Sequence, residues 1–230
     1  MASLGMASAQ PAAGSPSDAS AAERDDRQTQ LALSMDAHPA RGAALYRRHC
    51  AECHGARALG DPAHGIPALA GQRFAYVVRQ LANFANAERD NALMHDVTAR
   101  AALQSPQAWT DIGAYLNGRP NTAPLSVGPG SHIALGRGIF GRHCAGCHGA
   151  DAGGDADGFV PSLRHQHYVY LDAQMRKLAE GYRHNLDEEL KRFLQGFGDH
   201  EMSATADFLS RLTGPAKDRR HMRGDGVVVD

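Results

Sequence analysis

The four cysteines of this 230-residue chain all fall into two copies of one short pattern. Residues 50–54 read CAECH and residues 144–148 read CAGCH, so the second copy follows the first by 94 residues. In each copy, two cysteines are separated by two residues and a histidine follows directly. A pattern that uses every cysteine and occurs twice constrains the fold more strongly than any other feature of the sequence.

Cys-x-x-Cys-His is the attachment pattern of c-type haem. On a helical turn, thiols at this spacing lie on one side of the backbone, where they can add to the two vinyl groups of the haem. The histidine that follows projects over the ring, so its imidazole can reach the iron as the proximal ligand. The sequence therefore predicts two covalently bound haem groups. The residues predicted to hold them are Cys50, Cys53 and His54 for the first haem, and Cys144, Cys147 and His148 for the second.

Three other uses of a cysteine pair explain the sequence less well. A disulfide within each pair would need no adjacent histidine. A zinc site built from both pairs would need a much shorter separation than 94 residues. A thioredoxin-like redox pair follows a strand in a βαβ pattern, and the sequence shows no such pattern. Haem attachment accounts for the histidines as well as for the cysteines.

A shift of the chain by 94 residues aligns much more than the two motifs. The aligned pairs include Gly42 with Gly136, Asp61 with Asp155, Pro67 with Pro161, Leu69 with Leu163, and Gln80 with Gln174. Such self-similarity indicates an internal duplication, with two copies of one haem-binding domain. We expect a first domain at 37–118, a linker at 119–130, a second domain at 131–214, and disordered tails at 1–36 and 215–230.

Each copy shows the apolar spacing of helices. A first helix is expected at about 39–50, and a middle helix is expected to begin near Arg73 or His167. The middle helix of the first copy repeats apolar residues at helical spacing, namely Phe74, Val77, Val78, Leu81 and Phe84. A final helix, at 109–116 and 202–212, ends in an aromatic residue that we expect to pack on a glycine of the first helix. The predicted fold is all-α, with a small helical shell around each haem.

The composition excludes some classes of function. The net charge is −1, and no basic patch indicates nucleic-acid binding. No apolar run reaches the roughly 18 residues of a transmembrane segment. Near the N-terminus, Ala7-Ser8-Ala9 followed by Gln10 resembles the end of a secretory signal. We therefore hypothesise that the chain begins inside its own signal peptide and that the protein is exported.

With these motifs in place, the sequence resembles the class I c-type cytochromes, and its tandem arrangement resembles the dihaem cytochromes of the c4 type. The resemblance covers about residues 37 to 214. It implies two tandem class I cytochrome c domains and a periplasmic location. In that family a proline after the haem motif accepts a hydrogen bond from the proximal histidine through its carbonyl group. Pro67 and Pro161 match this position, so the resemblance implies that they orient His54 and His148.

Members of the family place a methionine, as sixth ligand of the iron, in the loop after the middle helix. The resemblance assigns this role in the first copy to Met94, with the adjacent His95 as second choice. Methionine ligation raises the reduction potential of a haem. The second copy has no methionine there, and Glu188, a poor partner for ferrous haem, falls opposite Met94.

Three interpretations of the second iron stay open. His184 is the first choice and would complete a bis-histidine site of lower potential. Alternatively, the iron is five-coordinate and open to small ligands. The third interpretation recruits a more distant group, which would be one of Met202, His200, Lys191, His165 and His167.

A small helical shell around a buried haem, without another catalytic constellation, is typical of an electron carrier. The sequence shows no paired acid and base beyond the haem ligands, no glycine-rich phosphate loop, and no nucleophile placed beside a base. We expect a periplasmic dihaem cytochrome that shuttles single electrons between redox proteins, such as a terminal oxidase, a quinol-oxidising complex or a dehydrogenase. The alternative is the electron-accepting subunit of a dehydrogenase, or a haem protein that binds small ligands at an open second haem.

Overall fold

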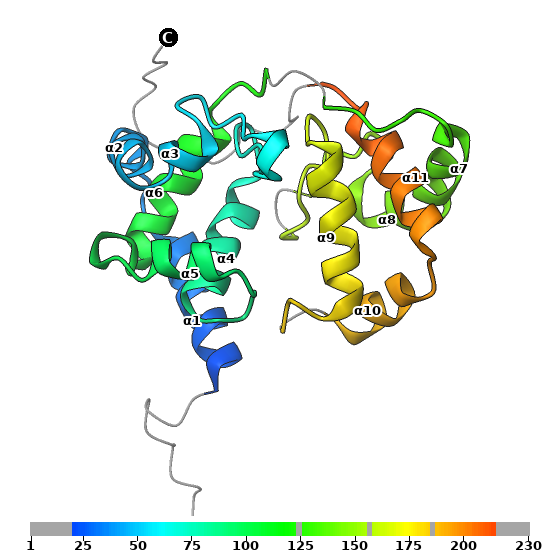
Figure 1. The fold of residues 1–230 in the computed structure, drawn as a ribbon. Coiled ribbons are helices and arrows are strands. Elements are labelled where there is room, and N and C mark those ends of the chain that lie inside the picture. Colours follow the sequence, from blue (N-terminus) through cyan, green and yellow to red (C-terminus); the bar gives the residue numbers. More distant parts are fainter. Residues whose placement is uncertain (1–19, 123–125, 156–157, 185–186, 215–230) are drawn as a thin grey trace, which may run out of the picture.

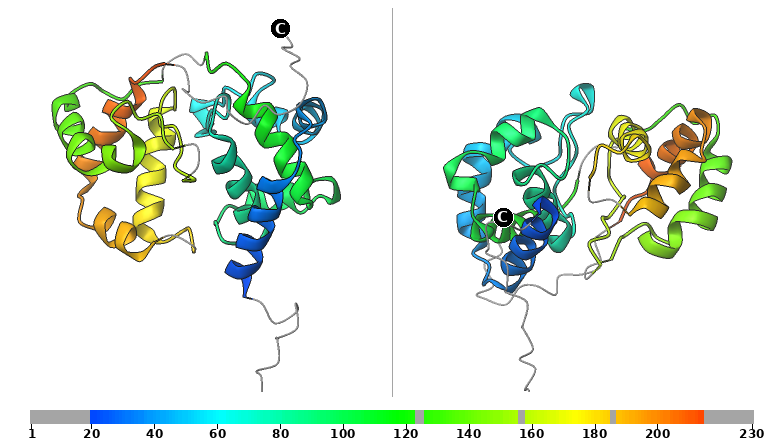
Figure 2. Two further views of the ribbon diagram at one scale, coloured as in Figure 1. Left: turned by 180° about the vertical axis from the view of Figure 1, so that it is seen from behind. Right: turned by 90° about the horizontal axis from the view of Figure 1, so that it is seen from below.

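The computed structural model describes residues 20–122, 126–155, 158–184 and 187–214, and within these residues the fold is helical without a β-sheet. Two halves lie side by side, with residues 20–122 in one and the remaining described residues in the other (Figures 1 and 2). This confirms the predicted all-α fold. The helices are, in chain order, α1 (Ala21–Ser34), α2 (Pro39–His49), α3 (Ala51–His54), η2 (Pro62–His64), α4 (Phe74–Ala85), α5 (Ala92–Thr98), η3 (Ala101–Leu103), α6 (Pro106–Asn117), α7 (Ile133–Ile139), η4 (Phe140–Cys144), α8 (Ala145–His148), α9 (Tyr168–Glu180), α10 (Glu188–Gln195) and α11 (Asp199–Ser210).

Local sequence signals explain where the main helices begin. α2 has Pro39 in its first turn, where the missing N–H of proline costs nothing. α6 begins after Ser105, whose Oγ accepts a hydrogen bond from Ala108 N at 3.2 Å. The final helices start three residues earlier than predicted, at Pro106 and Asp199. The first turn of α11 is polar and that of α6 begins with Pro106 and Gln107, so apolar spacing alone does not reveal them.

In each half, the helix that precedes the haem motif (α2 or α7) crosses the last helix of that half (α6 or α11) at a glycine. A Cβ added to Gly42 would overlap with the backbone carbonyl of Asp111, and one added to Gly136 would overlap with that of Ala204. The nearest neighbour of each glycine is therefore a helix backbone rather than the predicted aromatic side chain, because the missing Cβ allows two backbones to approach closely. The aromatic rings instead pair with each other, Tyr46 with Tyr115 and Phe140 with Phe208.

The duplication extends to the backbone conformation of the loops. Among the described residues, six positions with positive φ recur 94 residues later. These pairs are Gly55 and Gly149, Ala58 and Ala152, Gly60 and Gly154, Gly65 and Phe159, Gly71 and His165, and Ala87 and Gly181. Positive φ is unfavourable for a residue with a Cβ. Its occurrence at the fully buried Ala58 and Ala152 shows that tertiary packing determines the loop path after each haem motif.

A disordered tail is predicted at 1–36, but the structure forms the helix α1 over Ala21–Ser34, so the prediction is wrong for this part. Ser20 and Glu23 form a capping box, in which Glu23 Oε2 accepts from Ser20 N at 2.8 Å and Ser20 Oγ accepts from Glu23 N at 3.2 Å. α1 packs against α4 and α6, and the carbonyl of the fully buried Ala32 accepts from Thr110 Oγ1 at 2.6 Å. Residues 1–19, with the hypothesised signal remnant, and the predicted tail at 215–230 lie outside the described residues.

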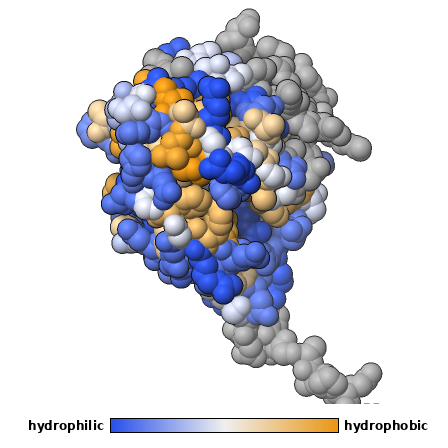
Figure 3. All heavy atoms as spheres, turned by 90° about the vertical axis from the view of Figure 1, so that its right-hand side faces the viewer, coloured by the Kyte–Doolittle hydropathy of each residue, from blue (hydrophilic) through white to orange (hydrophobic). Residues whose placement is uncertain are grey.

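The outer surface carries apolar side chains on one side of the second half. The face of the molecule on the side of α7 shows a group of them surrounded by polar residues (Figure 3). Apolar patches with a polar rim are common where soluble proteins contact one another. In the part of the chain that the structure describes, no helix combines the length and the apolar character needed to cross a membrane.

The glycine crossing gives a stability prediction. We expect Gly136→Ala to lower the free energy of unfolding by roughly 1–3 kcal/mol, because the added methyl group forces α7 and α11 apart. Urea unfolding of the haem-loaded protein, followed by circular dichroism, measures this. Gly141→Ala is the matched control, since a Cβ there meets nothing within 4 Å. Equal stability of the two variants would contradict the close crossing.

The buried carboxyl group of α1 gives a pH prediction. Asp25 is fully buried, and burial raises its pKa from 3.8 to about 6. The folded protein therefore binds more protons than the unfolded chain between these pH values, and stability falls as pH rises through them. We expect Asp25→Asn to increase the free energy of unfolding by about 1–2 kcal/mol at pH 7 and by much less at pH 4. Denaturant titrations at both pH values, with the exposed Asp26→Asn as control, check the sign; a larger gain at pH 4 would reverse it.

Candidate haem-binding sites

The two haem motifs occupy equivalent places, after α2 in the first half and after α7 in the second. Cys50 lies between α2 and α3, and Cys144 ends the π-helical turn η4 before α8. Cys50 and Cys144 are partly buried, whereas Cys53 and Cys147 are exposed. All four thiols are free of disulfide bonds. They are therefore available for thioether bonds, and the disulfides considered as an alternative are not formed.

The histidine of each haem motif is held by the predicted proline carbonyl. Nδ1 of His54 lies 3.1 Å from Pro67 O, and Nδ1 of His148 lies 3.2 Å from Pro161 O. Because a carbonyl oxygen can only accept, Nδ1 carries the hydrogen and the lone pair is on Nε2. Such a bond fixes the orientation of the ring and makes Nε2 a more basic metal ligand. The contact implied by the family resemblance is present in both halves.

Burial sets the protonation of these groups. It lowers the pKa of His54 and of His148, against the smaller opposing effect of the bond to the proline carbonyl. Both imidazoles are therefore neutral at pH 7, which is the form that binds a metal. Burial also raises the pKa of the Cys50 and Cys144 thiols to about 11. These two thiols are protonated at pH 7 in the polypeptide fold.

An apolar cluster lies beside each motif. The buried members of the first are Tyr46, Ala58, Ala70, Val77, Leu103, Ile112 and Leu116, and those of the second are Phe140, Ala152, Leu171, Ala206 and Leu209. Cys50 and Ala51 pack against the first cluster, and Cys144 and Ala145 pack against the second. Free paired thiols, a neutral imidazole with its Nε2 lone pair, and an apolar wall are the donor set and surroundings that covalent haem needs. The residues present fit this group.

Met94 lies on the short helix α5, which follows α4 and contacts it. A loop is predicted there; instead, Asn91 caps a helix by accepting a hydrogen bond from Met94 N at 3.1 Å. Met94 and the second choice, His95, are partly buried, whereas Leu93 is 77% exposed. α5 therefore turns Met94 rather than Leu93 towards the protein. Its bond to iron stays a prediction.

The equivalent segment of the second half is tied to the first half. His184 Nε2 lies 3.1 Å from Asp90 Oδ1, and His184 N donates to Glu88 O at 2.8 Å. The His184 side chain is 52% exposed. Ligation of the second iron by His184 would require its imidazole to leave Asp90. The structure does not bring His184 and His148 together, so this role stays a prediction.

Other nitrogen groups considered for the second iron also have partners elsewhere. These contacts are His167 with Leu59, His165 with Gly214, His200 with His132, and Lys191 with Glu188. Met202 differs, because it is only 5% exposed and lies in an apolar cluster with Ala179 and Leu194.

Met175 of α9 is a sulfur-bearing side chain that was not predicted to matter. It packs against the cluster that Cys144 and Ala145 contact, and also against the cluster that contains Met202. In the 94-residue repeat it aligns with Leu81, which packs against the first haem cluster. The second half thus has a thioether where the first half has a hydrocarbon side chain. The repeat alignment alone would have revealed this difference.

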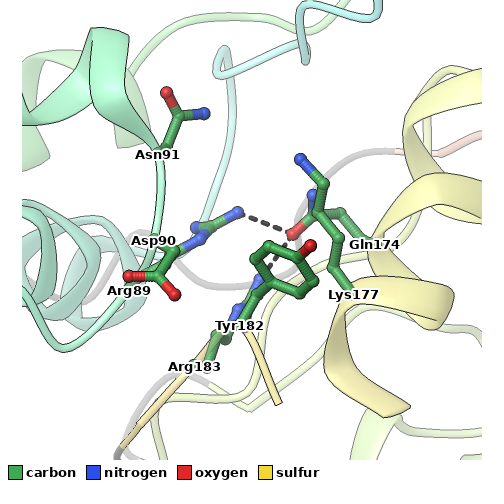
Figure 4. Close-up of a pocket in the computed structure, with 7 residues that line it drawn as sticks. All are labelled: Arg89, Asp90, Asn91, Gln174, Lys177, Tyr182 and Arg183. Carbon is green, nitrogen blue, oxygen red and sulfur yellow. Dashed lines mark hydrogen bonds between the residues drawn. The ribbon is translucent and has the colours of Figure 1, made fainter. Parts of the chain in front are cut away.

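A cluster of polar side chains lies at the boundary between the two halves, where equivalent residues of the repeat contact each other. The buried Arg89 donates to Gln80 Oε1 at 2.7 Å. Figure 4 shows that Arg89 also donates to Gln174 Oε1, at 2.7 Å, and that Arg183 donates to the same oxygen, at 2.9 Å. Arg89 and Arg183 are equivalent in the repeat and form a backbone bridge. Burial alone would raise the pKa of Tyr76, but Arg183 and Arg89 together lower it. These residues were not predicted, because their meeting depends on how the halves are placed.

Family models match both halves of the chain. The model described as "Cytochrome c" matches residues 133–213. The model described as "Cytochrome C oxidase, cbb3-type, subunit III" matches residues 37–116. Each match contains one Cys-x-x-Cys-His motif, in agreement with the duplication.

The matches to two individual relatives cover at least two thirds of this chain and four fifths of each relative. The chain is 31% identical over 201 residues to the "Thiosulfate dehydrogenase electron acceptor" of Stutzerimonas stutzeri. This match covers 79% of this chain and 91% of that protein. It is 31% identical over 168 residues to "Cytochrome c4" of Pseudomonas aeruginosa, covering 67% and 80%. The fold matches that of reduced recombinant cytochrome c4 from Pseudomonas stutzeri with a TM-score of 0.67 and 21% identity, over 77% of this chain and 100% of that chain.

Proposed function

The chain belongs to the dihaem cytochromes of the cytochrome c4 type, and from this premise we propose that it accepts electrons from a thiosulfate dehydrogenase and passes them to a terminal oxidase. It is an electron carrier with two covalent haem c groups, one in each half. Each haem, when bound, takes up or releases one electron at its iron. The observation that carries the choice of donor is the similarity, over most of both chains, to a protein named as a thiosulfate dehydrogenase electron acceptor.

Equivalent residues of the two sites have the same proposed roles. We assign haem attachment to Cys50, Cys53, Cys144 and Cys147, iron ligation to His54 and His148, and ring orientation to Pro67 and Pro161. The hydrogen bonds to the two proline carbonyls hold the imidazoles in one orientation. A fixed ring and an apolar wall keep the site nearly unchanged between the oxidised and reduced states, so little reorganisation opposes electron transfer.

We further propose that the two irons differ on their distal side. In the first half, Met94 on α5 supplies a soft thioether that favours ferrous iron. In the second half, α10 follows α9 and carries no methionine. His184 stays the candidate that the sequence suggests, although Asp90 holds its ring. Unlike distal sides imply unlike potentials, so that one haem receives an electron and the other hands it on.

The proposed acceptor and location rest on the family. The match of residues 37–116 to a model named for a subunit of a cbb3-type oxidase supports a terminal oxidase as the acceptor. Haem attachment to such thiols takes place outside the cytoplasm in the family that the sequence resembles. We therefore place the protein in the periplasm, as a carrier rather than an enzyme.

Reduction kinetics test the proposed donor. The natively matured, haem-loaded protein is mixed with thiosulfate and a purified thiosulfate dehydrogenase in a stopped-flow spectrometer. We expect both haems to be reduced at a rate that rises with dehydrogenase concentration. A single-haem class I cytochrome c at equal haem concentration is the control and should be reduced more slowly. Reduction no faster than that of the control would contradict the proposed donor.

Absorption spectroscopy tests the difference between the two irons. The ferric protein should show the weak far-red band of methionine-ligated haem at half the intensity per haem of a protein with two such sites. Met94→Leu should abolish this band, because the first iron loses its thioether. Met175→Leu, the matched change in the second half, should leave it intact. Full intensity per haem in the unchanged protein would refute the asymmetry. A band that persists in Met94→Leu would show that a methionine other than Met94 is an iron ligand and would refute the role of Met94.

A further inference from the structure

Two glutamines cross the boundary between the halves in a reciprocal arrangement. Gln72 of the first half donates from Nε2 to Ser162 O at 2.9 Å and accepts at Oε1 from Ser162 N at 2.8 Å. Gln166 of the second half makes the same pair of bonds to Ala68, at 2.9 Å from Nε2 to Ala68 O and 3.0 Å from Ala68 N to Oε1. Gln72 and Gln166 are equivalent in the repeat, as are Ala68 and Ser162. The interface is therefore two-fold symmetric at these four residues.

Each glutamine reaches the peptide group that holds the proximal histidine of the opposite half. The Pro67–Ala68 peptide accepts from His54 Nδ1 through its carbonyl and donates to Gln166 Oε1 through its N–H. In the other half, the Pro161–Ser162 peptide accepts from His148 Nδ1 and donates to Gln72 Oε1. A single peptide plane thus links each imidazole to a side chain of the other half.

The glutamine amides are held in place before they cross the boundary. Oε1 of each also accepts from the backbone N–H of the next residue, Arg73 N at 2.8 Å and His167 N at 3.0 Å. Gln166 is 7% exposed, and Ala68 is 3% exposed. A buried bond between preorganised groups is little weakened by competition with water.

A second symmetric pair of contacts docks the halves without touching these peptides. Arg73 Nε donates to Gly153 O at 2.7 Å, and His167 Nε2 donates to the equivalent Leu59 O at 2.8 Å. Arg73 and His167 are again 94 residues apart. Docking therefore does not depend on the glutamines alone, which separates their effect on the histidines from their effect on assembly.

Hydrogen bonds in a chain polarise one another. A peptide that donates through its N–H becomes a stronger acceptor at its carbonyl, and a stronger acceptor at Nδ1–H makes the imidazole a more basic ligand, which favours ferric iron. We infer that Gln166 is a positioning residue for His54, that Gln72 is one for His148, and that each half of the protein thereby sets the reduction potential of the haem in the other half. The inference rests on haem bound at both sites and does not depend on the electron donor.

The test is a crossed pattern of potentials. Gln166→Met keeps the length of the side chain and removes both bonds to Ala68, together with the bond from His167 N. We expect it to shift the reduction equilibrium of the first haem towards the ferrous state by roughly two- to ten-fold and to leave the second haem, in its own half, unchanged. Gln72→Met should shift the second haem and spare the first. Redox titration followed by proton NMR of the hyperfine-shifted haem methyl groups assigns each change to one haem.

Controls separate tuning from loss of docking. His167→Phe removes an interface bond that lies off the Pro67–Ala68 peptide and should leave the first haem unchanged. Gln166→Glu keeps the Oε1 acceptor for Ala68 N and should bring the equilibrium of the first haem back to, or beyond, its original position. A shift confined to the haem in the same half as the substitution, an equal shift in His167→Phe, or no shift in either methionine variant would overturn the inference.

Discussion

A hydrogen bond from an imidazole Nδ1 to a proline carbonyl constrains the path of the chain after each haem motif. Pro67 follows His54 by only thirteen positions, and within this short segment the chain must turn back to His54. The turn is closed by Gly60 N donating to His54 O at 3.0 Å, and Gly154 N and His148 O repeat the bond at 2.8 Å. It also forces the buried Ala58 and Ala152 into the left-handed region, a local cost that the surrounding core must offset. The same loops carry the peptides at which the halves meet, so ligand geometry and domain docking share one piece of backbone.

The two halves resemble each other in the haem motif and the proline that follows it. They differ in the segment that follows the middle helix. On the proximal side, the thiols, the imidazole and the proline carbonyl repeat closely. On the distal side, the seven-residue α5 is replaced by the eight-residue α10, and residues 182–184 pair with 88–90 across the boundary. The two copies thus share the residues of the haem motif and differ in the segment that we propose to lie on the distal side of the iron. The difference in iron ligation that we propose would give direction to electron transfer between two otherwise similar sites.

Sequence patterns predicted the features that depend on local chemistry. The haem motifs, the repeat and the middle helices could be recognised because each follows from residue type and spacing, whereas the role of the two prolines came from the resemblance to class I c-type cytochromes. α1 could also have been recognised, since Ser20 and Glu23 are a readable capping signal. The partners of His184, Arg89 and Gln166 could not, because they lie in the other half and their positions depend on docking. The repeat alignment shows that the two glutamines are equivalent. Local sequence does not predict that each of them contacts the opposite half.

Contacts between equivalent residues of two copies are those of an isologous interface, in which one surface patch pairs with itself. Gln72 with Ser162 mirrors Gln166 with Ala68, and Arg89 lies opposite its own counterpart, Arg183. A single half would present a self-complementary patch and could pair with an identical molecule. The present chain therefore has the form of a fused homodimer: an ancestral one-haem protein that associated through this patch, followed by gene duplication and fusion, would yield this geometry directly. In that view the linker did not create the interface but made an existing one permanent.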